Sequence, residues 1–118
     1  MHYVRLIQND TDLALSITLY IQRGSDPSAL LGTLNVEVPA LATVETQYGD
    51  LHNSFLCGIR IKARPAAQIG EVRAYVYQAG DPVDQWLNGG YALAITRSRL
   101  YSLSPQQDAD HPSAAETH

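Results

Sequence analysis

The chain has 118 residues, of which 45% are hydrophobic, and a formal net charge of −4 at pH 7. This length is typical of one domain with its own core, and no apolar run approaches the ~20 residues that a membrane-spanning helix needs. The single cysteine, Cys57, excludes an intrachain disulfide, so we expect a soluble, cytoplasmic protein, with the mature form of a secreted protein as the alternative.

Alternation of apolar and polar residues with a period of two predicts strands along most of the chain. In order, the predicted strands cover residues 3–8, 13–22, 33–38, 42–48, 55–63, 71–78 and 92–103. The clearest lies in 13–22, where one face holds Leu13, Leu15, Ile17, Leu19 and Ile21. In 55–63 the predicted inner face holds Phe55, Cys57, Ile59, Ile61 and Ala63.

Turn-forming residues separate the predicted strands, and they include a polar connection of hairpin size at Asn9–Asp12. About seven strands with one apolar and one polar face predict an all-β fold, a single-domain two-sheet antiparallel β-sandwich over residues 1–103. Its expected core includes Leu15, Ile17, Leu19, Cys57, Ile59, Val72, Ala74 and Val76. Residues 104–118 contain Asp108, Asp110 and Glu116 but no Lys or Arg, which predicts a flexible acidic tail.

The strand pattern is similar to immunoglobulin-like and cupredoxin-like sandwiches by analogy of fold alone. The tryptophan–cysteine pairing of true immunoglobulin domains is missing, and a shared fold does not imply a shared function. A copper site of the cupredoxin kind needs two histidines, a cysteine and usually a methionine, whereas the only methionine here is Met1. We therefore expect no metal, no cofactor and no recognisable set of catalytic residues.

The segment Asp81–Tyr91, DPVDQWLNGGY, contains the only tryptophan. Asp81 followed by Pro82 is typical of a helix N-cap and first helical position. Trp86 offers a ring on which a sugar could stack, and hydrogen-bonding groups come from Asp81, Asp84, Asn88 and Tyr91. The competing interpretation, which we favour, is that Trp86 is largely buried and plugs the end of the sandwich, because a buried indole removes ~150–250 Å² from water.

Basic residues gather in the second half of the chain, from Arg60 onward. Arg60, Lys62 and Arg73 with Tyr75 and Tyr77 would form a basic, aromatic surface of the kind that single-strand nucleic-acid binders use. The sequence pI of 5.4 argues against a nucleic-acid partner, because such domains usually have a pI above ~9.

These patterns favour a non-catalytic binding module whose partner is a protein or another copy of the chain, because the sequence combines no catalytic constellation with many half-polar strands, some of which could be open sheet edges. The first alternative is a carbohydrate-binding module that uses the Asp81–Tyr91 segment. The second is an enzyme with a site near His52, which is the only histidine in the predicted domain away from the N-terminus. No membrane partner is expected.

Overall fold

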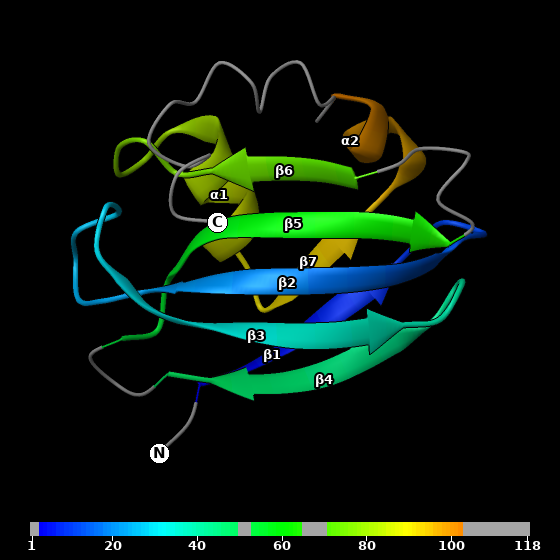
Figure 1. Ribbon diagram of the computed structural model, residues 1–118, viewed down its shortest axis with the longest axis horizontal. Coiled ribbons are helices and arrows are strands. Elements are labelled where there is room, and N and C mark those ends of the chain that lie inside the picture. Colours follow the sequence, from blue (N-terminus) through cyan, green and yellow to red (C-terminus); the bar gives the residue numbers. More distant parts are fainter. Residues whose placement is uncertain (1–2, 50–52, 65–70, 103–118) are drawn as a thin grey trace.

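The computed structural model describes residues 3–49, 53–64 and 71–102, which form seven strands and two short helices (Figure 1). The strands are β1 (Tyr3–Asn9), β2 (Ala14–Gln22), β3 (Leu30–Val38), β4 (Thr43–Tyr48), β5 (Leu56–Arg64), β6 (Glu71–Tyr75) and β7 (Ala92–Ile95). The helices are α1 (Pro82–Asn88) and α2 (Arg97–Ser102). Neither helix is long and apolar enough to cross a membrane.

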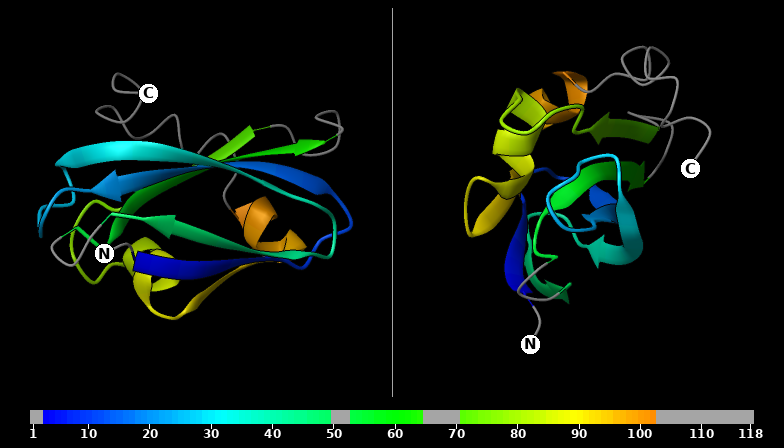
Figure 2. Two further views of the ribbon diagram at one scale, coloured as in Figure 1. Left: turned by 90° about the horizontal axis from the view of Figure 1, so that it is seen from below. Right: turned by 90° about the vertical axis from the view of Figure 1, so that its left-hand side faces the viewer.

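The strands form two layers, which confirms the predicted all-β sandwich (Figure 2). One sheet has the order β4-β1-β7 and the other has the order β3-β2-β5-β6. All pairs are antiparallel except β1 with β7, which run parallel from Leu6↔Ala92 to Asn9↔Ile95. Strands joined by a tight hairpin must be antiparallel. Strands β1 and β7 are separated by five other strands and by α1 in the chain, so this constraint does not apply to them.

The core between the sheets comes from the predicted alternation. Leu15, Ile17 and Leu19 of β2 are at most 1% exposed, and Ile17 and Leu19 lie opposite Ile61 and Ile59 of β5. Each pair places two branched aliphatic side chains on the same buried face, which is the arrangement that stabilises a sheet. Val72, Ala74 and Val76 complete this part of the core, as predicted.

The predicted inner face of β5 is wrong at its first residues because of a β-bulge. The register shifts between Tyr20↔Gly58 and Ile21↔Leu56, so Cys57 has no partner in the ladder. An extra residue of this kind puts the alternation before it out of phase with the alternation after it. Leu56 therefore enters the core with 0% exposure and Phe55 is 48% exposed, while Cys57 is buried in a separate cluster with Tyr20 and Tyr75.

The last predicted strand is too long. Only Ala92–Ile95 is a strand, and Arg97–Ser102 forms α2. The reason is local capping: Thr96 Oγ1 accepts a hydrogen bond from the Arg99 amide, and its carbonyl accepts one from the Leu100 amide. The turn of helix then places Leu100 in the core with 0% exposure, a position that a straight strand would not reach.

The connection between β1 and β2 passes from one sheet to the other and is not a hairpin. Asn9 and Thr11, predicted to be turn residues, are 1% and 2% exposed. The Asn9 side chain donates to the carbonyls of Leu13 and Pro39 and accepts from the Thr11 amide and hydroxyl. Because buried polar groups need partners, this network ties the β1–β2 connection to the end of β3.

Candidate functional site

Asp81 is a helix cap in the structure, as predicted. Its Oδ1 accepts from the Asp84 amide at 2.8 Å, and its Oδ2 accepts from the Tyr77 and Gln78 amides at 3.0 and 3.2 Å. Pro82 follows as the first helical residue. Burial acts to raise the pKa of Asp81, but the amides that donate to its carboxylate outweigh burial and hold the pKa below its usual value.

The other predicted polar ligands also make bonds within the protein. Asp84 accepts from the Gly80 amide and from Asn88 Nδ2, both at 2.7 Å. Asn88 Oδ1 accepts from the Leu56 amide at 2.7 Å, and Asn88 Nδ2 donates to the Leu56 carbonyl at 2.8 Å. The structure therefore brings Asp81, Asp84 and Asn88 together, in an arrangement that fastens α1 to itself and to β5.

Trp86 is partly buried and packs against the core from α1. Its indole N–H donates to the Ala94 carbonyl at 3.0 Å, and the guanidinium carbon of Arg99 lies 4.9 Å from the ring centroid, which is a cation–π contact. The ring thus joins α1, β7 and α2, in line with the role of a plug. Tyr91 lies beyond α1 and is 60% exposed.

His52 lies outside the described residues, and so does the predicted tail, residues 104–118. Among the residues that are described, no group of three or more His, Cys, Asp or Glu could hold a metal ion. Burial raises the pKa of the Cys57 thiol to about 11, so at neutral pH it is protonated and a weak nucleophile.

The clearest concentration of polar chemistry lies on the solvent side of the β3-β2-β5-β6 sheet, which we call the outer face. The strand registers align its side chains in two cross-strand rows. One row is Glu37–Ser16–Lys62–Glu71 and the next is Asn35–Thr18–Arg60–Arg73. Because side chains two apart along a strand point to the same side, all eight residues belong to this one face.

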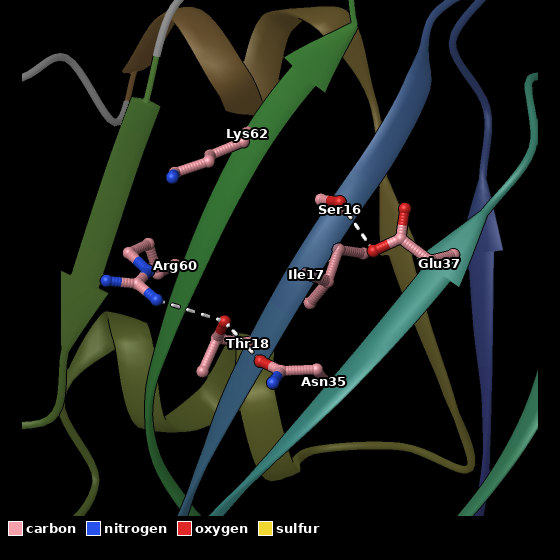
Figure 3. Close-up of a pocket in the computed structure, with 7 residues that line it drawn as sticks. All are labelled: Ser16, Ile17, Thr18, Asn35, Glu37, Arg60 and Lys62. Atoms are coloured by element: carbon pink, nitrogen blue, oxygen red, sulfur yellow. Dashed lines mark hydrogen bonds between the residues drawn. The ribbon is translucent and has the colours of Figure 1, made fainter.

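A hollow of about 240 Å³ lies over the middle of the outer face (Figure 3). It is lined by Ser16, Ile17, Thr18, Asn35, Glu37, Arg60 and Lys62. The Ser16 hydroxyl donates to Glu37 at 2.5 Å, the Thr18 hydroxyl donates to Asn35 at 2.8 Å, and Arg60 donates to Thr18 at 3.5 Å. The Glu37 carboxylate and the Arg60 guanidinium therefore both contact side chains of β2.

Three cations share one carboxylate beside the hollow. Glu71 lies 3.0 Å from Arg73, 3.6 Å from Arg60 and 3.9 Å from Lys62. Arg60 and Arg73 are directly opposed across the strands, an arrangement that costs ~0.2–1 kcal/mol for like charges unless a counter-ion lies nearby. Glu71 supplies that counter-ion, and among the described residues it is the one carboxylate that Arg60 and Lys62 share, so these two cations make this side of the hollow electropositive.

The predicted aromatic part of this surface differs from the expectation. Tyr75 is 7% exposed and its ring centroid lies 5.8 Å from that of Tyr20. The two rings cover Gly58, where an added Cβ would come within 2.8 Å of Tyr75 and 3.0 Å of Tyr20. Tyr77 follows β6 and is 61% exposed. The structure thus has the basic residues on one face without a pair of exposed rings beside them.

Strand β3 forms one edge of the outer-face sheet (Figure 1). It is nine residues long, and its only charged residue is Glu37. At its beginning Leu30 and Leu31 are 39% and 38% exposed. Within the described part of the chain, β3 pairs only with β2.

Sequence reasoning did not identify the hollow, because its walls come from three strands that are far apart in the chain. The available signal was the polar half of each alternation, such as Ser16 and Thr18 in β2, but the strand order was needed to align these halves. Comparison with protein-family models, curated proteins and solved structures finds no match.

Proposed function

We propose that the protein is a non-catalytic binding module that recruits a protein partner by strand addition at the β3 edge. The observation that carries this proposal is the length and composition of β3. Seven consecutive residues, 30–36, carry no charge and include no proline or lysine. Edges that avoid association usually carry lysine, proline or a bulge, or are very short. Strand β3 has one irregularity, at Leu31, where its register with β2 shifts between Ile21↔Gly32 and Gln22↔Leu30, and residues 32–36 beyond it pair with β2 in a regular register.

The energetic basis is the row of backbone groups that an edge strand presents to solvent. An added strand satisfies these N–H and C=O groups, and its side chains add contacts on both faces. The half-exposed Leu30 and Leu31 would lose water contact in such a complex, at about 25 cal/mol for each Å² of apolar surface.

The remaining edges are less suitable. Strand β6 has five residues and contains Glu71 and Arg73, whereas β7 has only four residues. Strand β4 has six residues with Glu45 in the middle. Because backbone pairing energy grows with the number of paired residues, β3 is the edge on which a partner strand gains most.

A second copy of the chain is the simplest partner. Two β3 strands related by a two-fold axis would pair antiparallel and join two four-stranded sheets into one. Glu37, at the end of the strand, would oppose its own copy only if the axis passed through that residue. A register centred on residues 32–34 keeps the two copies of Glu37 well beyond the direct and diagonal positions at which like charges meet.

The carbohydrate alternative has less support. The side chains of Asp81, Asp84 and Asn88 already bond to backbone groups or to each other, and Arg99 lies over the Trp86 ring. A sugar would have to replace or share these interactions. An enzymatic site near His52 stays a prediction, because that residue lies outside the described part.

Sedimentation velocity over a range of concentrations tests the proposal. We expect the wild-type chain to form dimers as its concentration rises, and we expect Leu31→Lys to remain monomeric because a lysine on the edge opposes pairing. The variant should keep its melting temperature, since Leu31 is already 38% exposed.

Leu41→Lys is the matched control, because Leu41 is also an exposed leucine, at 74%, but lies in the connection between β3 and β4. It should dimerise as the wild type does. If Leu31→Lys forms the same dimer as the wild type, association uses another surface and the proposal is wrong.

A further inference from the structure

We propose that the hollow on the outer face is a binding site for a small zwitterion, a free molecule of amino-acid size with a carboxylate at one end and an ammonium group at the other. The inference goes beyond protein recruitment at the β3 edge and does not depend on it. It follows from the charges, donors and spacing of the residues in Figure 3.

The carboxylate end is recognised on the β5 side of the hollow. The only ion-pair partner of Arg60 and Lys62 within the described residues is Glu71, which they share with Arg73. Arg60 has five N–H donors in a planar fork and suits carboxylates, while Lys62, whose side chain is 60% exposed, can swing over the hollow. A ligand carboxylate would reduce the local excess of positive charge.

The ammonium end is recognised on the β3 side. The Glu37 carboxylate is held over β2 by the Ser16 hydroxyl, and a carboxylate offers about four acceptor positions, so it can accept from a ligand as well. Asn35 Oδ1 accepts from the Thr18 hydroxyl, and because an amide oxygen has two lone pairs it can also accept from the ligand ammonium.

The spacing selects a molecule that carries both charges. Glu37 is anchored at Ser16 and Arg60 contacts Thr18, and these two positions of β2 are separated by about 7 Å, because each residue rises 3.2–3.4 Å. The two charged groups are thus anchored at different positions of β2 with the hollow beside both, so a ligand that carries a charge of each sign can contact both groups at once.

Size and sign exclude other ligand classes. The volume of about 240 Å³ is below the ~300–1,000 Å³ of typical drug-sized sites, so the ligand is small. A phosphate dianion would be attracted by Arg60 and Lys62 but would also face Glu37, and like charges at close range are unfavourable. A zwitterion satisfies both walls without adding net charge.

The experiment compares three probes of similar size: 4-aminobutyrate, butyrate and butylammonium. Binding is followed by the amide shifts of Ser16, Thr18 and Asn35 in two-dimensional ¹H–¹⁵N NMR. We expect saturable shifts with 4-aminobutyrate in the millimolar range and about tenfold weaker binding of each singly charged probe, because each lacks one charge-assisted contact.

Three variants locate the contacts. Lys62→Gln should weaken 4-aminobutyrate binding by about tenfold. Glu37→Gln should bring the affinity ratio of 4-aminobutyrate to butyrate close to one, since the ammonium group loses its partner. Arg23→Gln is the control: Arg23 is exposed in the β2–β3 connection, away from the hollow, and this variant should bind as the wild type does.

Two results would overturn the proposal. One is the absence of saturable shifts at these amides with 4-aminobutyrate. The other is a Glu37→Gln variant that keeps the wild-type preference for 4-aminobutyrate over butyrate. Lys62→Gln and Glu37→Gln each replace an exposed charged residue with an uncharged one of similar size. The amide shifts of β1, β4 and β7 report whether the sandwich stays folded in these variants.

Discussion

Arg5 is the residue whose position is least expected for its chemistry. It lies on the inner side of β1, is 1% exposed, and donates through Nη1 to the carbonyl of Leu87 near the end of α1. The carbonyls in the last turn of a helix lack partners within the helix and attract cations. Its Nε and Nη2, however, have no hydrogen-bond partner among the described residues, so a charge is buried with incomplete compensation.

We predict that Arg5→Met leaves the free energy of unfolding within about 1 kcal/mol of wild type or raises it, because apolar side chains of similar volume often replace buried charges without loss. Arg5→Ala should instead lower it by about 2–5 kcal/mol, since a cavity remains. Urea denaturation measures both. A loss above about 2 kcal/mol in Arg5→Met would show that the bond to Leu87 outweighs the cost of burying the charge.

At the scale of elements, α1 is held to the sandwich by the side chain of Asn88, which bonds to the backbone of β5 as a neighbouring strand would. Asn88 bonds to both the amide and the carbonyl of Leu56, where β5 begins after Phe55. We predict that Asn88→Ala lowers the free energy of unfolding by about 1–3 kcal/mol, because two part-buried backbone groups lose their partner. Thermal denaturation measures this change in the free energy of unfolding, with one value of the heat-capacity change of unfolding used for both proteins.

Gln85→Ala is the control for the same helix. Gln85 is exposed, and among the described residues its side chain bonds only to the Gly80 carbonyl, so we expect a change below about 0.5 kcal/mol. Because alanine has the highest helix propensity, neither variant loses stability through propensity, and equal losses would mean that the bonds of Asn88 to β5 contribute no more than the one exposed bond of Gln85.

The elements that could be predicted are those whose pattern is complete within the segment. Strand β2 has four large aliphatics in strict alternation, and the α1 cap is encoded by Asp81 followed by Pro82. The bulge at Cys57 could not be predicted, because it depends on the register between β5 and β2. In β1, Val4, Leu6 and Ile7 place apolar residues on both sides, so the burial of Arg5 was not visible either.

The hollow on the outer face and the open edge at β3 could not be predicted either, because both depend on the order of the strands in the sheet. Ser16, Glu37 and Lys62 stand in one row only because β2 lies between β3 and β5. Each is an ordinary polar residue of a half-exposed strand in the sequence. Likewise, the open edge at β3 is a property of strand order, since any strand in the chain could have taken the edge position.

At the scale of the whole molecule, the last side chain that the described structure places in the core is Leu100 of α2, which is 0% exposed. Its burial contributes about 1.5–3 kcal/mol, and Arg99 of the same helix lies over Trp86. Residues 104–118 contain no aliphatic side chain larger than alanine, so they offer the sandwich little apolar surface. The domain should therefore be complete at Leu103.

We predict that a chain ending at Leu103 has a melting temperature within about 2 °C of the full chain, a difference below 1 kcal/mol for a domain of this size. A chain ending at Ile95 should melt several degrees lower, because the Leu100 site is left empty and the Trp86 ring loses Arg99. Differential scanning calorimetry at two salt concentrations distinguishes apolar packing from charge contacts, because salt weakens only the charge contacts. If removal of 104–118 lowers the melting temperature by several degrees at low salt and not at high salt, the acidic residues Asp108, Asp110 and Glu116 stabilise the domain by contact with its basic residues, since screening weakens such contacts. That result would contradict the tail prediction and would identify the electropositive side of the outer face as the first surface to examine.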